Sequence, residues 1–196
     1  MSRSHAKLVE VRPLEAIAQD QIRPLRRAEY DKLVELGVFQ DEHIELLYGQ
    51  LVEMTPIGPP HSSGVQKLTV LLVRALADRA AVRVQSPFAA LDHSEPEPDF
   101  TVVPPGDYDT EHPKTAWLII EVAESSLSRD RGLKQRLYAE CGVPEYWVVN
   151  LVDRRIEVHV EPREGAYARV TPYRKGEVIR LQHFPDVEIA VDDILK

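Results

Sequence analysis

The run AWLIIEV at residues 116–122 is almost continuously apolar, as expected of a β-strand buried on both faces at the centre of a sheet. A helix is predicted from Asp130 to Cys141, because side chains at spacings of three and four share one stripe and Gly142 provides a stop. The run from Glu145 to Val152 predicts a second buried strand. This stretch therefore predicts an α/β domain with both strands in its core.

Shorter elements are predicted on either side of this core. Apolar spacing predicts helices over 24–36 and 62–79, the second of them preceded by a proline-rich break, PIGPPHS, at 56–62. A β-hairpin is predicted around Gly49, and the last three of the extended runs predict an antiparallel extension. The extended runs are 44–48 and 50–55 in the hairpin, then 82–85, 88–91, 99–103, 155–160, 167–173 and 177–181.

The length of 196 residues suits one domain. Residues 1–23 mix charges with Pro13 and show no sustained period, so they are interpreted as an N-terminal arm, and residues 24–196 as the domain. No segment approaches the ~20 apolar residues that span a bilayer, and the opening residues have no apolar signal core. The single cysteine, Cys141, fits a reducing compartment, and we expect a cytoplasmic protein without membrane contact.

The charge balance limits the partners that the chain can bind. Its 24 Lys and Arg against 32 Asp and Glu give a net charge of -8, which excludes a protein that coats DNA by bulk charge. A local basic face or a bound divalent cation can still reverse the potential where a phosphate must bind. Arg129, Arg131, Lys134 and Arg136 are the candidates for a locally basic groove.

Two carboxylates occur where apolar residues are expected. Glu121 interrupts the apolar run 117–122, and a buried carboxylate is costly unless it is paired or bound to a metal. Asp99 opens the preceding predicted strand, so on neighbouring strands the two carboxylates would lie ~5 Å apart and could hold a hard cation such as Mg²⁺. The alternatives are that Glu121 has already reached solvent at a strand end and that Asp99 is an ordinary strand-entry residue.

A lysine on the following predicted helix is the third candidate site residue, after Asp99 and Glu121. Lys134 shares a stripe with Leu137 and Tyr138, on or beside the face that packs. The alternative is a surface ion pair with Asp130 at i, i+4, with Asp130 also capping the helix. Two carboxylates on adjacent strands and a lysine from the covering helix are the groups needed to split a phosphodiester.

The chain resembles the Uma-type restriction endonuclease family of the PD-(D/E)XK nuclease superfamily. The resemblance covers residues 25 to the C-terminus and implies a restriction-endonuclease-like fold, a mixed central sheet flanked by helices with antiparallel β extensions. It rests on Pro98 with Asp99, LIIEV (118–122), Asp130 with Lys134, YAECGVPEYWVVN (138–150), IELLYGQLVEMTP (44–56) and GPPHS (58–62).

The resemblance also implies roles for individual residues. Asp99 and Glu121 correspond to the metal ligands. The superfamily lysine, two residues after the glutamate, is replaced by Ala123, so the resemblance implies that Lys134 substitutes for it from the helix. Glu45 in the hairpin and His61 after the proline loop are secondary candidates. Their alternatives are a solvated strand glutamate and a surface or capping histidine.

We therefore expect a Mg²⁺-dependent DNA endonuclease in which Asp99 and Glu121 hold the metal and Lys134 orients water or steadies negative charge. Mn²⁺ is the alternative ion, and a homodimer is expected because nucleases of this superfamily often pair. Two other functions stay open: a catalytically inactive binding or assembly module on the same scaffold, and a phosphatase or nucleotide hydrolase that uses the same cation.

Overall fold

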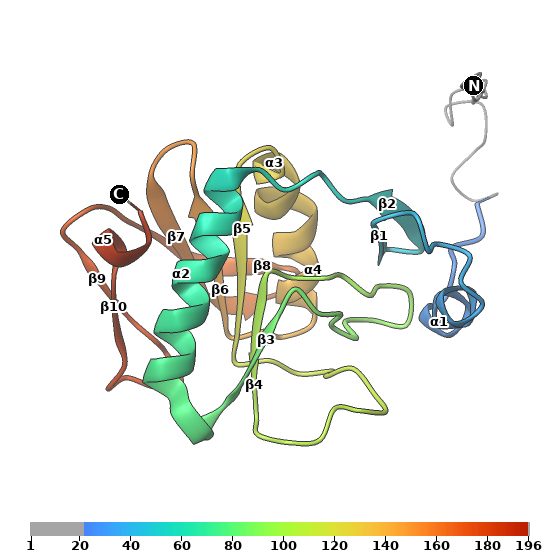
Figure 1. Ribbon diagram of the computed structural model, residues 1–196, viewed down its shortest axis with the longest axis horizontal. Helices are drawn as coiled ribbons and strands as arrows, with labels where there is room; N and C mark the ends of the chain where they lie inside the picture. The colour runs from blue at the N-terminus through green and yellow to red at the C-terminus, as the bar shows by residue number, and fades with distance from the viewer. Residues whose placement is uncertain (1–21, 196) are drawn as a thin grey trace, which may run out of the picture.

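The computed structural model of the chain describes residues 22–195 (Figure 1). The predicted arm, residues 1–23, lies almost wholly outside this range, so its boundary stays a prediction. In the described part of the chain, no helix is both long enough and apolar enough to cross a membrane.

A six-stranded mixed sheet forms the centre of the domain. Its order is β3-β4-β5-β6-β7-β8, and only β5 and β6 pair in parallel. Every residue of β5 and β6 is buried, which confirms the two central strands predicted from their apolar runs. The strands are β3 (Ala81–Val84), β4 (Phe100–Val103), β5 (Leu118–Ala123), β6 (Glu145–Asn150), β7 (Arg155–Arg163) and β8 (Ala166–Tyr173).

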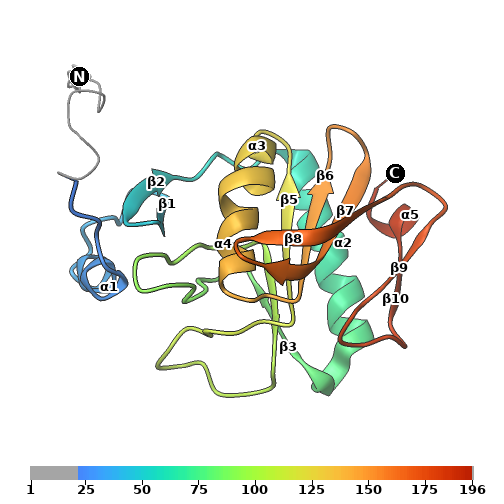
Figure 2. The ribbon, with the colours of Figure 1, turned by 180° about the vertical axis from the view of Figure 1, so that it is seen from behind.

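Helices cover both faces of this sheet. The long helix α2 (Pro59–Leu76) buries Leu68, Leu72 and Leu76 against one face. The other face is covered by a helical segment made of α3 (Leu127–Arg129), the π-helical turn η4 (Asp130–Lys134) and α4 (Gln135–Glu140), as Figure 2 shows from behind. The predicted helix 130–141 is therefore present, but it begins three residues earlier and contains a π-turn.

The proline cluster starts a helix, where a break was predicted. Pro59 and Pro60 occupy the first two helical positions of α2, where a missing backbone N–H costs nothing and the fixed φ suits the helix. The helix predicted over 62–79 thus begins at Pro59 and ends at Leu76, followed by a short 3₁₀ turn, Ala77–Arg79. As a result, His61 lies in the first turn of α2.

The N-terminal elements form a separate layer beside the sheet (Figure 1). The predicted hairpin is confirmed as β1 (Ile44–Leu47) and β2 (Gln50–Glu53). Tyr48 and Gly49 both have positive φ, the conformation that a two-residue hairpin turn needs. The first helix, α1 (Arg27–Glu35), begins three residues after Pro24.

The remaining differences from the predicted elements are short. The predicted run 88–91 is not a strand: Phe88 and Ala89 are buried in a connecting segment before β4. In the C-terminal extension, β7 and β8 pair as predicted, but β9 (Val178–Arg180) pairs with β10 (Glu188–Ala190) in a separate sheet. The final helix, α5 (Val191–Ile194), packs beside α2.

Candidate active site

The strand register brings Asp99 and Glu121 together. Phe100 of β4 is opposite Ile120 of β5, so Asp99 and Glu121 occupy the next position of this antiparallel pair. The Asp99 carboxylate accepts a hydrogen bond of 2.8 Å from the backbone N–H of Val122, next to Glu121. Asp99 is 7% exposed and Glu121 is 4% exposed, which excludes a solvated strand end for Glu121.

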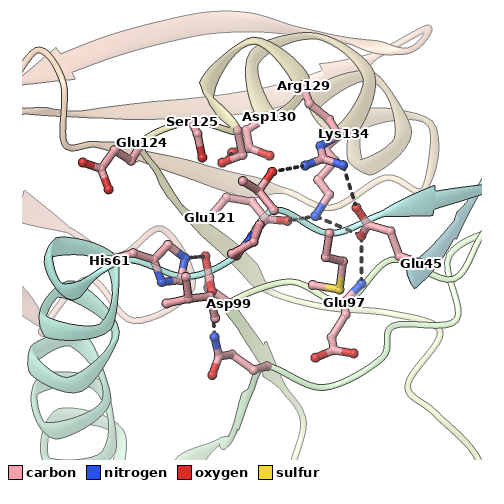
Figure 3. Close-up of a pocket in the computed structure, with 17 residues that line it drawn as sticks. Glu45, His61, Glu97, Asp99, Glu121, Glu124, Ser125, Arg129, Asp130 and Lys134 are labelled. Carbon is pink, nitrogen blue, oxygen red and sulfur yellow. Dashed lines mark hydrogen bonds and ion pairs between the residues drawn. The ribbon is translucent and has the colours of Figure 1, made fainter. Parts of the chain in front are cut away.

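Lys134 reaches the same place from the covering helix. Its ammonium nitrogen, Nζ, donates to Glu121 Oε1 at 3.0 Å, and the Tyr138 hydroxyl donates to the same oxygen at 2.7 Å. The alternative of a surface Asp130–Lys134 pair is wrong: Lys134 is 4% exposed, and Asp130 instead accepts a hydrogen bond of 2.6 Å from the Ser126 hydroxyl. The three residues predicted from separate elements therefore line one pocket (Figure 3).

The π-turn contains two buried charged residues. A π-turn adds a residue to the helical turn, and such turns are frequent at functional sites. Asp130 and Lys134 are its first and last residues, and both are buried. Both line the pocket, while Tyr138, one turn later, lies beneath it and contacts Glu121.

Glu45 holds Lys134 from the opposite side. Its Oε2 lies 3.0 Å from Lys134 Nζ and accepts the backbone N–H of Glu97 at 3.3 Å. Glu45 is 1% exposed, so the alternative of a solvated strand glutamate is wrong. The hairpin β1–β2 is not part of the central sheet, yet it contributes the side chain of Glu45 to the pocket.

His61 lies against Asp99 from the first turn of α2. Its Nε2 is 3.0 Å from Asp99 Oδ2, while Gln85 donates to the other oxygen of Asp99 at 3.3 Å. The hydrogen bond to Asp99 raises the pKa of His61, against the opposing effect of burial. The Nδ1 atom of His61 is buried without a hydrogen-bond partner among the described residues.

Burial dominates the electrostatics of the pocket. It raises the pKa of Glu121 to about 8, and the neighbouring Lys134 only partly opposes this. For Lys134, burial acts to lower the pKa, but the carboxylates of Glu121 and Glu45 outweigh it and raise the pKa overall. The raised pKa favours the ammonium form of Lys134, which can stabilise negative charge.

The donor set of the pocket fits a hard divalent cation. Six carboxylates line it against two permanent cations, Arg129 and Lys134, and the space within it is about 70 Å³. In the described part of the chain, no three His, Cys, Asp or Glu side chains are grouped closely enough to hold a metal ion by themselves. Two carboxylates suit Mg²⁺, which usually keeps several waters. The lining carboxylates are Glu45, Glu97, Asp99, Glu121, Glu124 and Asp130.

The basic groove suggested by the helix sequence is not present. Arg129 does line the pocket and donates to the Glu53 carbonyl at 3.1 Å. Arg131, however, is paired with Glu157 of β7, and Arg136 is paired with Glu140 on the helix surface. Residues at these spacings point to different sides of the helix, so only two of the four basic residues reach the pocket.

Sequence reasoning missed part of the pocket wall. Glu97, Gln85, Glu124 and Ser125 come from segments outside regular structure, where no periodicity indicates direction. The contact of Tyr138 with Glu121 could have been inferred, because Tyr138 shares the helical stripe of Lys134. A tyrosine at this position also fits simple core packing, however, so the pattern does not decide between the two.

A mixed sheet with one carboxylate directly before β4, a second carboxylate on β5 and a lysine from the covering helix defines a restriction-endonuclease-like protein. The chain belongs to the Uma2 family, described as "Putative restriction endonuclease", whose model matches residues 27–192. No curated protein matches the chain.

A solved structure supports the fold. The crystal structure of "a putative nuclease belonging to DUF820" from Anabaena variabilis ATCC 29413 is similar with a TM-score of 0.69. The similarity covers 87% of this chain and 97% of that chain, at 15% sequence identity. Together, the family and this fold indicate a nuclease.

Proposed function

We propose that the chain is a Mg²⁺-dependent endonuclease that hydrolyses phosphodiester bonds in DNA. The observation that carries this proposal is the convergence of Asp99, Glu121 and Lys134 in one buried pocket, with Lys134 Nζ 3.0 Å from Glu121. Burying this many charges has a large desolvation cost, which a purely structural site would not need.

Each residue has a distinct role in the proposed reaction. Asp99 and Glu121 would hold Mg²⁺, which when bound supplies a water of lowered pKa and neutralises charge on the phosphate. Water oxygen bonds to phosphorus as the bond to the leaving oxygen breaks, the water gives up its proton to solvent, and the leaving oxygen takes a proton from solvent. Lys134, held as an ammonium by Glu121 and Glu45, stabilises the negative charge that develops on the phosphate oxygens. His61 and Gln85 fix the orientation of Asp99.

The size of the pocket favours a polymer as the substrate. Its space of about 70 Å³ admits an ion with a few waters, whereas sites that enclose a small molecule have about 300–1,000 Å³. A phosphate of a nucleic-acid backbone can reach the pocket from outside without its base entering. This argues for a nuclease over a nucleotide hydrolase that encloses its substrate.

Cleavage of plasmid and linear DNA with increasing Mg²⁺ tests the proposal. We expect metal-dependent cleavage by the wild-type chain and losses of about 10²- to 10⁴-fold in Asp99→Asn and Glu121→Gln, because each change removes a metal ligand. Lys32→Gln, an exposed change on α1 prepared in parallel, controls for contaminating nucleases. Equal Mg²⁺-dependent cleavage by the wild type and both ligand variants would contradict the proposal, and a folded, metal-binding but inactive wild type would favour the binding module.

A further inference from the structure

A second cavity lies on the other side of the first turns of α2. It has a volume of about 180 Å³, and its wall comes from α2, from the turn between β6 and β7, and from α5. Figure 1 shows α5 beside α2. Its eight lining residues are Pro60, Ser63, Gly64, Lys67, Leu151, Arg154, Ile194 and Leu195.

The charge of this cavity is opposite to that of the candidate active site. Lys67 and Arg154 line it together with Ser63, and no carboxylate is among its lining residues. In a chain with a net charge of -8, two bases line this cavity and no acidic residue lines it with them, although Asp153 precedes Arg154 in the sequence. An anion is the ligand that this wall can bind, through charge and through N–H and O–H donors.

The two bases also have donors to spare. Lys67 donates one hydrogen bond, of 2.8 Å, to the carbonyl of Ile194, which leaves two of its three N–H groups. Arg154 is exposed at the β6–β7 turn. Neither residue forms an ion pair with any carboxylate that the structure describes. By contrast, Arg155, the next residue along the chain, and Arg131 of the π-turn are both paired with Glu157.

The cavity is close to the candidate active site. Gly64 of its wall packs on Val122 of β5, and a Cβ at Gly64 would lie 3.1 Å from the Val122 side chain. The backbone N–H of the same Val122 donates to Asp99. His61 in the acidic pocket and Pro60 in the basic cavity are consecutive residues of α2. The two pockets therefore adjoin along α2, so one nucleic-acid backbone can be considered for both.

We propose that the cavity lined by Ser63, Lys67 and Arg154 binds a non-scissile backbone phosphate of the nucleic acid whose scissile phosphate lies at Asp99 and Glu121. This inference rests on the proposed nuclease function and adds to it the means by which an acidic protein retains a polyanion. The acidic pocket needs a cation before it can accept a phosphate, whereas the basic cavity needs none.

Binding of a labelled DNA duplex tests the proposal in a Glu121→Gln background, which removes cleavage. We expect Arg154→Gln to weaken binding on the order of tenfold and to reduce the slope of log affinity against log salt by about one, as for a lost phosphate contact. Arg154→Lys keeps the charge and should retain most of the affinity. Lys32→Gln on α1 should leave both quantities unchanged.

Lys67→Met provides a second test of DNA binding. Because Lys67 also donates a hydrogen bond to Ile194, the melting temperature of this variant is measured, so that a loss of stability can be told apart from a loss of DNA affinity. Inorganic phosphate alone distinguishes the source of the anion. If it stabilises the wild type through Arg154 while DNA does not bind, the cavity takes free phosphate and the DNA assignment is overturned. Unchanged affinity and salt slope in folded Arg154→Gln and Lys67→Met would also overturn it.

The failure of this inference can be told apart from the failure of the nuclease proposal. Cleavage that depends on Glu121 but not on Arg154 or Lys67, with an unchanged KM, overturns the phosphate cavity alone. DNA binding that depends on Arg154 in a wild-type chain without Mg²⁺-dependent cleavage supports the cavity and contradicts the nuclease. Absence of DNA binding by the wild-type chain overturns both.

Discussion

The two pockets beside the first turns of α2 share one helix but have opposite charge. The pocket at Asp99 and Glu121 contains six carboxylates, and its lysine is almost completely buried. The cavity at Lys67 and Arg154 contains two bases and no carboxylate. The difference shows that net charge is a poor guide to the partner of this chain. Acidic and basic side chains gather in two separate pockets whose α2 residues lie only a few positions apart.

The largest difference between the two pockets is expected when their lysines are replaced, and it is a difference in the free energy of unfolding. Lys134→Met leaves Glu45 and Glu121 buried without their cation, and we expect a loss of about 3–5 kcal/mol in the free energy of unfolding. Lys67→Met removes one hydrogen bond to a carbonyl and should cost about 1 kcal/mol. Denaturant unfolding of both variants measures the difference. Similar losses for the two would contradict the charge balance described for the acidic pocket.

Metal and phosphate should stabilise the protein through different pockets. A Mg²⁺ concentration 100 times the dissociation constant should stabilise the wild type by about 2.7 kcal/mol, because only the folded chain presents the paired carboxylates. Asp99→Asn should abolish this gain, and Arg154→Gln should retain it. Thermal melts with increasing Mg²⁺ test this. A Mg²⁺ response that survives in Asp99→Asn would place the ion elsewhere.

Part of the pH dependence of stability should come from Glu121 in the acidic pocket. Burial raises the pKa of Glu121 from its ordinary 4.5 to about 8, so between these values the folded state binds more protons than the unfolded state. Without metal, stability should therefore fall as the pH rises through this window. Melting temperatures of the wild type and Glu121→Gln between pH 5 and 9 isolate the contribution. Identical profiles would contradict it, and Arg154→Gln, which adds no group titrating there, is the control.

The smallest effect is expected for the base on the helix surface. Arg136 is 68% exposed and paired with Glu140, away from both pockets. Arg136→Gln should leave cleavage and DNA affinity within about twofold of the wild type, since exposed ion pairs contribute little. A larger loss of DNA affinity would support the hypothesis of a basic groove along this helix. Binding titrations beside Arg154→Gln make the comparison.

Much of the fold and the centre of the site could be predicted, because both follow from the apolar runs. The run 116–122 predicts a buried strand, and a carboxylate inside it has to find a partner. The same reasoning cannot find Glu97 or Glu124, whose directions are set by tertiary contacts of irregular segments. The resemblance named Glu45, but its contact with Lys134 depends on where the hairpin packs.

The errors have physical causes as well. Proline usually ends helices, so the sequence predicts a break before His61, yet the first helical turn accepts proline. Proximity in sequence predicts one groove for the four helical bases, although Arg131 and Arg136 point away from the pocket in the helix. The elements at 188–190 and 191–194 are too short for any periodicity to reveal.

The π-turn at Asp130–Lys134 makes the pocket sensitive to chain length as well as to side-chain chemistry. The turn holds one residue more than an α-helical turn. Deleting Gly132, where an added Cβ would meet nothing within 4 Å, would place Asp130 and Lys134 three positions apart, where there are now four, and would draw them together by ~1.5 Å along the helix axis. The two residues would stay neighbours on the helix, but Lys134 Nζ would shift relative to Glu45 and Glu121, each of which it now contacts at 3.0 Å. A single codon deletion could thus alter these contacts without removing any charged group.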